Sequence, residues 1–157
     1  MTDQYLAYLQ LLDSLRSNLE SLCHLANEKV ATVNRDDLVG LDTIMRREQA
    51  LSLSFRGLEQ KKDALVQTLQ LQSVPLSALP EHSPDELRLQ AKRTVEALQD
   101  QYKIYGAATE VARNTLECNL HEIEKFLAAQ DTAAAAGPGY TTPAAEPPKA
   151  MKSDFRA

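Results

Sequence analysis

The sequence contains no tryptophan, and phenylalanine and tyrosine together make up only 5% of its 157 residues. The hydrophobic residues, 43% of the chain, are mainly leucine, alanine and valine. Such a composition is typical of helices that pack on helices. No segment alternates between polar and apolar residues for long enough to form a β-strand. The sequence therefore predicts an all-α protein.

The chain also lacks an excess of positive charge and a long apolar run. Its formal net charge is −5, whereas proteins that bind nucleic acids through phosphate contacts need clustered lysine and arginine. No stretch approaches the ~18 apolar residues of a membrane span. The N-terminal residues lack the basic flank and small-residue cleavage site of a signal peptide. We therefore expect a cytoplasmic protein that binds no nucleic acid and has no membrane span.

Cysteine and histidine are scarce, with two and three residues respectively. Cys23 and Cys118 fit a reducing compartment, in which they stay unpaired. Together with His24 and His121 they would make a nominal metal-binding set, but helical positions separate the two cysteines by roughly 20 Å along the bundle. The segment "HEIEK" (residues 121–125) has Lys125 where a zinc-protease motif needs its second histidine. With no phosphate-binding loop or nucleophile elbow either, the sequence predicts no metal site, no cofactor and no enzyme.

Proline is absent before Pro75, so nothing forces a helix to stop in the first part of the chain. Apolar residues at three- and four-residue intervals predict one helix over about residues 3–33 and a second over about residues 36–71. The short turn between them, with its polar residues Asn34 and Asp36, predicts an antiparallel hairpin. The proline-rich segment that follows includes "PLSAL" (residues 75–79), for which we expect a single turn.

A third helix is predicted over about residues 84–128. Ser83 is its expected N-cap, with Pro84 at the first helical position and Glu86 closing a capping box onto Ser83. At about 45 residues this helix would be longer than the other two. The economical architecture for residues 1–130 is an elongated three-helix, antiparallel (up-down-up), coiled-coil-like bundle. The far end of the third helix would then project beyond the hairpin or be covered by something else.

Charged residues interrupt the apolar stripes at Lys29, Glu48 and Lys62. Two interpretations of Glu48 and Lys62 are open. Their stems can lie at the margin of the stripe with the charged heads in water. Alternatively, they make a polar contact that fixes helix register or binds a partner.

The C-terminal residues, 131–157, have a different composition. The stretch "AAAAGPGYTTPAAEPP" (residues 133–148) holds four of the seven prolines. Alanine, glycine and proline offer little to bury, so we expect a disordered tail.

One part of the chain resembles a known family. The segment "LANEKVATVNRDDLVGLDTIMRREQALSLSFRGLEQKKDAL" (residues 25–65) is similar to the signature of FlgN-type flagellar export chaperones. The matching positions are Lys29 and Ala31, residues 37–41, Glu48 and Leu51, and residues 58–62. The linker "VPLSAL" and the helix end "NTLECNLHEIEKFL" are also similar, and the resemblance covers about residues 5–130. Family members often carry two asparagines three apart in the last helix, where this sequence has Thr109 and Ala112.

The resemblance implies a cytoplasmic chaperone of flagellar type III export. Such a chaperone holds the C-terminal amphipathic helices of hook-filament junction proteins of FlgK and FlgL type. It prevents their premature assembly and delivers them to the export gate protein FlhA, so that its link to the membrane is only through the export apparatus. Two alternatives are open: a non-enzymatic coiled-coil scaffold that oligomerises, and an export chaperone for another flagellar protein such as flagellin or the filament cap.

The candidate surface for the exported protein is an apolar face near the end of the third helix. Its members are Leu116, Leu120, Ile123, Phe126 and Leu127. The alternative is that this face packs on the first helix or in a homodimer. The resemblance also implies that a tail aromatic docks on FlhA, which makes Tyr140 the candidate, with an idle tyrosine in a linker as the alternative.

Overall fold

The computed structural model describes the backbone of residues 1–135 and the side chains of residues 1–132. In chain order it contains α1 (Thr2–Asn34), α2 (Leu38–Thr68), η1 (Leu76–Ala78), α3 (Leu79–His82), η2 (Asp85–Leu87) and α4 (Arg88–Ala135). Since the described residues form helices and turns and no strand, the predicted all-α class is confirmed. The chain divides into a compact unit of Met1–Asn119 and a second unit that begins at Leu120.

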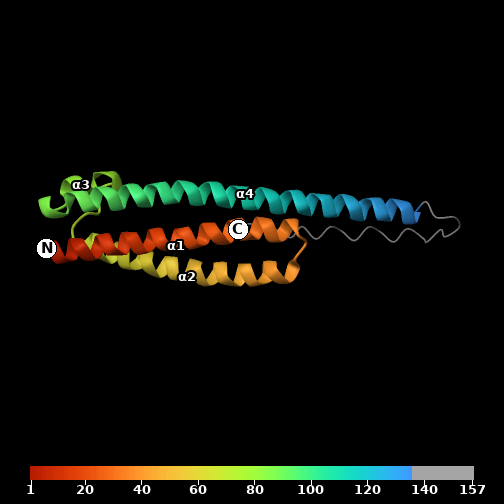
Figure 1. Cartoon of the computed structure of the whole chain (residues 1–157), viewed down its shortest axis with the longest axis horizontal. Coiled ribbons are helices and arrows are strands. Elements are labelled where there is room, and N and C mark those ends of the chain that lie inside the picture. Colours follow the sequence, from red (N-terminus) through yellow and green to blue (C-terminus); the bar gives the residue numbers. More distant parts are fainter. Residues whose placement is uncertain (136–157) are drawn as a thin grey trace. The chain divides into compact units, whose positions relative to one another are not determined.

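In the first unit, α1 and α2 form an antiparallel hairpin (Figure 1). The turn begins with two hydrogen bonds that end α1, from the Asp36 N–H to the Val33 carbonyl and from the Asp37 N–H to the Thr32 carbonyl, both 3.1 Å. Asp36 adopts a left-handed conformation with φ 56°. Asp37 then caps α2, because its carboxylate accepts a hydrogen bond of 2.9 Å from the Gly40 N–H. The turn therefore follows from two consecutive aspartates.

The core of the first unit is centred on α1. This helix contributes more buried apolar residues than any other, because it packs on both α2 and the first part of α4. The core cluster joins these buried residues: Tyr5, Tyr8, Leu9, Leu12, Leu15, Leu19, Leu22, Leu69, Leu71, Leu79, Ala91, Val95 and Leu98. The inward row of α2, including Leu51 and Phe55, is only partly buried. The first unit is thus a helical bundle that is more open along α2.

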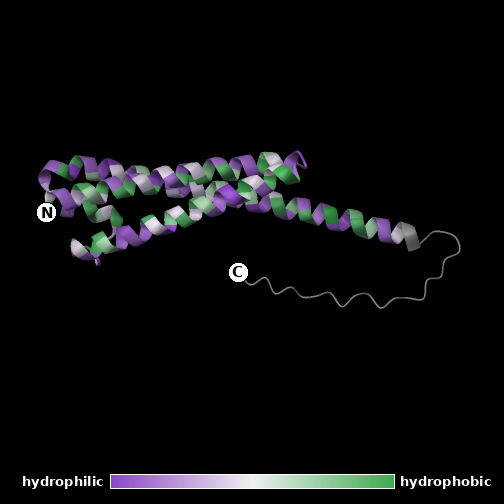
Figure 2. Ribbon diagram, turned by 90° about the horizontal axis from the view of Figure 1, so that it is seen from below, coloured by the Kyte–Doolittle hydropathy of each residue, from purple (hydrophilic) through white to green (hydrophobic). Residues whose placement is uncertain are grey.

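Hydrophilic and hydrophobic residues are interspersed along the long helices (Figure 2). This is the pattern of helices that bury one side and expose the other. Over the described residues, no helix is long and apolar enough to cross a membrane.

The connection between α2 and α4 corrects the prediction for Ser83. This residue is buried and lies at the C-terminal end of α3, where its hydroxyl donates a 2.8 Å hydrogen bond to the Leu79 carbonyl. Pro84 has an extended backbone and precedes the short η2, which has no side-chain cap. The capping box with Glu86 is therefore absent at this helix start. The preceding "PLSAL" segment forms η1 and the start of α3, and the Tyr5 hydroxyl donates a 2.9 Å hydrogen bond to the His82 carbonyl.

The last helix, α4, ends at Ala135, beyond the predicted end at about residue 128. No proline or glycine occurs between Gly106 and Gly137, and alanine is the strongest helix former. Residues 131–135, which we assigned to the tail, are therefore helical. The rest of the predicted tail, residues 136–157, lies outside the part of the chain that the structure describes.

The charged residues within the apolar stripes differ in their environment. Lys29 of α1 forms an ion pair with Glu48 of α2, and the Lys29 side chain is only 14% exposed. For Glu48, this favours the interpretation as a polar contact that fixes the register of two helices. Lys62 instead lies at the margin of its stripe, with its ammonium group 3.8 Å from the exposed carboxylate of the neighbouring Asp63.

Candidate functional site

The apolar face that the sequence singled out lies on α4. Leu116, in the first unit, is half-buried. The four members in the second unit are exposed: Leu120 by 57%, Ile123 by 56%, Phe126 by 62% and Leu127 by 53%. We refer to these four residues as the apolar row. The structure therefore places large apolar side chains on the surface at this end of the helix.

The apolar row continues the side of α4 that is buried in the first unit. Val95, Leu98 and Ala112 are buried, and three- and four-residue steps along the helix lead from them to Leu120 and Ile123. Every described side chain from Leu120 to Thr132 is exposed. Along one side of this single helix, the side chains thus change from buried in the first unit to exposed in the second.

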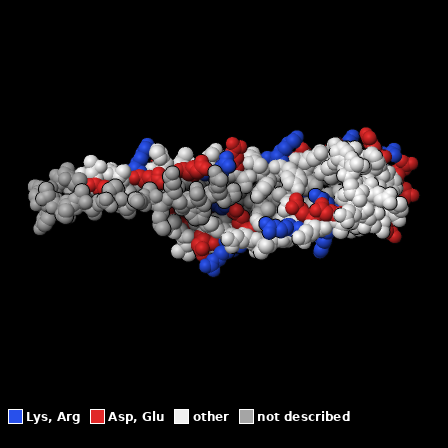
Figure 3. All heavy atoms as spheres, turned by 180° about the vertical axis from the view of Figure 1, so that it is seen from behind, with Lys and Arg blue, Asp and Glu red and all other residues white. Residues whose placement is uncertain are grey.

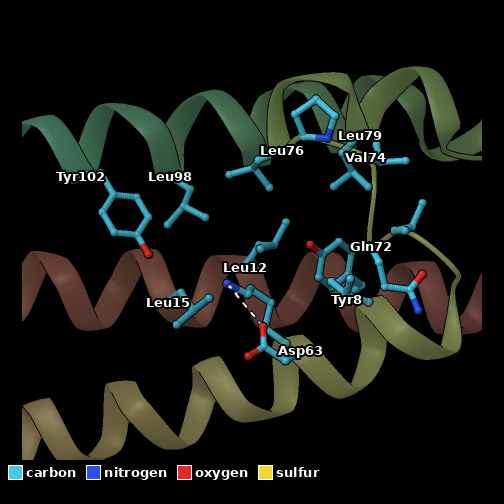
Figure 4. A pocket seen from close by; sticks show the side chains of 14 residues that line it. Tyr8, Leu12, Leu15, Asp63, Gln72, Val74, Leu76, Leu79, Leu98 and Tyr102 are labelled. Carbon is cyan, nitrogen blue, oxygen red and sulfur yellow. Dashed lines mark ion pairs between the residues drawn. The ribbon is translucent and has the colours of Figure 1, made fainter.

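A pocket of about 260 Å³ opens in the first unit near the connection between α2 and α4 (Figure 4). Most of the residues that line it are apolar, among them Leu12 and Leu15 from α1, Leu79 from α3 and Leu98 from α4. The charged groups at its edge are Asp63 and the neighbouring Lys62. Because its volume lies below that of sites for drug-sized ligands, this pocket suits at most a small apolar group.

Tyr8 lines the same pocket, and its side chain is almost completely buried. Burial raises the pKa of its hydroxyl above the usual 10.0, and the negative charge of Asp63 raises that pKa further. Tyr8 is therefore neutral at physiological pH. It supplies no charge for chemistry in the pocket.

A shallow groove of about 310 Å³ runs between α1, α2 and α4. Phe55 and Tyr102 meet there edge to face, with ring centroids 6.4 Å apart. Burial raises the pKa of both Tyr102 and Tyr105, and the nearby carboxylates Glu59 and Glu48, respectively, add to the effect. This groove was not predicted from the sequence. The signal was present in the aromatic residues within the apolar stripes of two predicted helices.

The two cysteines lie in different surroundings. Cys23 is buried in α1 and accepts a 3.2 Å hydrogen bond from the Gln101 side chain of α4, whereas Cys118 is exposed. Burial raises the pKa of the Cys23 thiol. Both cysteines are unpaired. Within residues 1–132, no three His, Cys, Asp or Glu side chains come close enough together to hold a metal ion.

The charged side chains on one face of the molecule mark no further site among the described residues. Acidic and basic side chains are interspersed on the face drawn in Figure 3, and the described residues form no continuous basic patch there. Tyr140, the candidate for docking on the export gate, lies outside the described residues.

Comparison with protein-family models, curated proteins and solved structures found no match for this chain. The resemblance to FlgN-type chaperones stays a prediction. Among the side chains of residues 1–132, the apolar row is the largest group of exposed, large apolar side chains close together on one helix.

Proposed function

We propose that this protein is a cytoplasmic FlgN-type chaperone of flagellar type III export, built as a three-helix up-down-up bundle. It binds the C-terminal amphipathic helices of hook-filament junction proteins of FlgK and FlgL type, prevents their premature assembly and delivers them to the export gate protein FlhA. The observation that carries the proposal is the apolar row, four large side chains that are each more than half exposed on one helix.

A partner helix would bury this row in the manner of an amphipathic helix that lies along a hydrophobic surface. Complete burial of a leucine, isoleucine or phenylalanine side chain contributes about 1.5–3 kcal/mol. Since each side chain of the row is roughly half exposed, the four together would contribute about 3–6 kcal/mol. Association costs about 4–15 kcal/mol, which is as much as this gain or more, so the partner's own apolar side chains, buried in the same contact, must supply the rest. The row therefore suits a reversible complex, as a chaperone that releases its cargo requires.

The proposal can be tested by calorimetric titration of the full chain with the C-terminal segment of a FlgK-type protein. Ile123 and Ile104 form a matched pair, because both lie on α4 and each is 56% exposed. Ile104 directly precedes the inward-facing Tyr105 and therefore points about 100° away from that side of the helix. We expect Ile123→Asp to weaken binding at least about tenfold and Ile104→Asp to leave it unchanged.

The titration is run with the unsubstituted chain at about 50 μM, a concentration that detects micromolar complexes. If no heat of binding is measured under these conditions, the proposal is overturned. Parallel titrations with flagellin and filament-cap segments would show whether another flagellar protein is the cargo.

The same row also favours a second candidate function, a coiled-coil scaffold in which two copies cover each other. Light scattering separates the two. A scaffold forms a dimer that the FlgK-type segment does not dissociate, whereas a chaperone exchanges any self-contact for its cargo. For delivery to FlhA, we propose Tyr140 as the docking residue.

A further inference from the structure

The spacing of the apolar row defines a register for the helix that would bind it. Leu120, Ile123 and Leu127 follow one another at intervals of three and four residues. These are the intervals of the a and d positions of a heptad, which form the seam between two paired helices. With Leu120 and Leu127 at a and Ile123 at d, Phe126 falls at g and widens one flank of the seam with another apolar side chain.

The other flank of the seam is acidic. Glu124 and Asp131 occupy the two successive e positions of this register, and both side chains are exposed. Neither forms an ion pair with another described residue. Lys125, the only lysine or arginine between Leu120 and Thr132, lies at f, on the outer side of the helix. Two negative charges one heptad apart therefore border the seam, and no lysine or arginine between Leu120 and Thr132 lies on the same flank.

The e and g positions of paired helices determine which partner is accepted and in which orientation. A second copy of this chain pairs poorly here. In an antiparallel pair, e positions lie opposite e positions, so carboxylates would meet carboxylates. In a parallel pair, the e positions would face the uncharged g positions Asn119 and Phe126. Neither arrangement gives the acidic flank an opposite charge.

From this asymmetry we propose that the apolar row binds an amphipathic helix of another protein that carries lysine or arginine along one flank of its apolar stripe. The basic side chains face Glu124 and Asp131, while the apolar stripe covers Leu120, Ile123 and Leu127. This inference rests on the proposed function, in that it takes the row to be a surface for a partner helix, and it adds the chemical class of that helix. Opposite charges along the flank speed encounter and reject like-charged helices.

Two synthetic amphipathic peptides test the inference with the full chain. They have identical leucines at a and d, and the flanking positions carry lysine in one peptide and glutamate in the other. We expect the lysine peptide to bind about tenfold more tightly, the combined effect of two charge pairs. This preference should decrease as salt is raised from about 50 mM to about 500 mM, because salt screens exposed charges.

Charge reversal supplies the matched variants. The double variant Glu124→Lys/Asp131→Lys should invert the preference between the two peptides. Glu122→Lys changes the same kind of side chain on the same helix, but at position c, away from the seam, and should leave the preference intact. Circular dichroism of both variants checks that the helix content is retained.

The possible outcomes separate the inference from the proposed function. Equal affinity for the two peptides, or a chain dimer that the lysine peptide does not dissociate, would overturn the inference. Binding of the FlgK-type segment without any preference between the peptides would overturn the inference and leave the proposed function standing. Preference for the lysine peptide without binding of the FlgK-type segment would support the inference and remove the proposed cargo.

Discussion

The burial of the Tyr8 side chain should make the free energy of unfolding depend on pH in alkaline solution. Its pKa is raised above 10.0 by burial and by Asp63. A group with a raised folded-state pKa contributes stability that is fully present below its unfolded pKa and lost as the pH rises through the folded value. The free energy of unfolding should therefore fall above pH 10, and Tyr8→Phe should make that fall smaller.

Urea unfolding followed by circular dichroism at several pH values from about 8 to about 11 measures this dependence. Tyr102 and Tyr105 also have raised pKa values, so the variant should keep part of the slope. A Tyr8→Phe protein with the full slope of the unsubstituted chain would show that Tyr8 does not contribute.

The helix α2 ends in a Schellman motif in which Gln70 takes the position that usually holds glycine. The Gln70 N–H donates to the Gln67 carbonyl at 3.1 Å, and the Leu71 N–H donates to the Val66 carbonyl at 2.9 Å. These are the two bonds of a Schellman motif, whose left-handed position usually holds glycine. Here that position holds Gln70, with φ 57°.

We expect Gln70→Gly to stabilise the protein by about 0.5–1 kcal/mol. A left-handed conformation costs a residue with a side chain about 1–2 kcal/mol, and the greater freedom of glycine in the unfolded chain removes part of this gain. Gln70→Ala is the matched control and should bring no gain, because alanine meets the same steric conflict. The midpoints of urea unfolding compare the three proteins. A glycine variant no more stable than the alanine variant would contradict the expectation.

Gln70 also shows why the sequence predicted the helices better than their ends. The 3-and-4 spacing of apolar residues is local, so the positions of α1 and α2 could be predicted to within about three residues. Nothing in the identity of Gln70 marks a left-handed residue, and the second helix was therefore predicted to run to residue 71 instead of Thr68. The prediction for Ser83 was wrong for a different reason: at the end of α3, its hydroxyl bonds to the Leu79 carbonyl, and this short helix begins at the last residue of the segment predicted as a single turn.

Of the two candidate surfaces, the apolar row could be predicted from the sequence and the groove between α1, α2 and α4 could not. Leu120, Ile123 and Leu127 continue a stripe that is visible in the sequence, so their common side of α4 could be predicted. The groove beside Phe55 and Tyr102 depends on how closely two helices separated by the α2–α4 connection approach each other. The spacing of apolar residues within one helix gives no information on the distance between α2 and α4.

At the scale of the whole molecule, the proposed function assigns cargo binding and gate docking to different segments. The apolar row lies on α4, and Tyr140 lies in the C-terminal segment, outside the described residues. Because the two contacts share no side chain, we expect Tyr140→Ala to leave binding of the FlgK-type segment unchanged and to lower its export. Tyr140→Phe, which keeps the aromatic ring, should export normally.

Calorimetry measures the first quantity, and the amount of hook-associated protein in the culture medium of flagellated cells measures the second. Equal loss of binding and export in the alanine variant, or loss of neither, would contradict a separate docking role for Tyr140.

Because the two cysteines differ in exposure, one of them can be labelled selectively with a fluorescent dye. Maleimide dyes react with thiolates, and burial together with a raised pKa keeps Cys23 protonated and shielded at neutral pH. Cys118 is exposed and stands two positions before Leu120. A single fluorophore can therefore be attached to the unaltered sequence beside the apolar row. Its emission would follow the arrival and departure of a partner helix in real time.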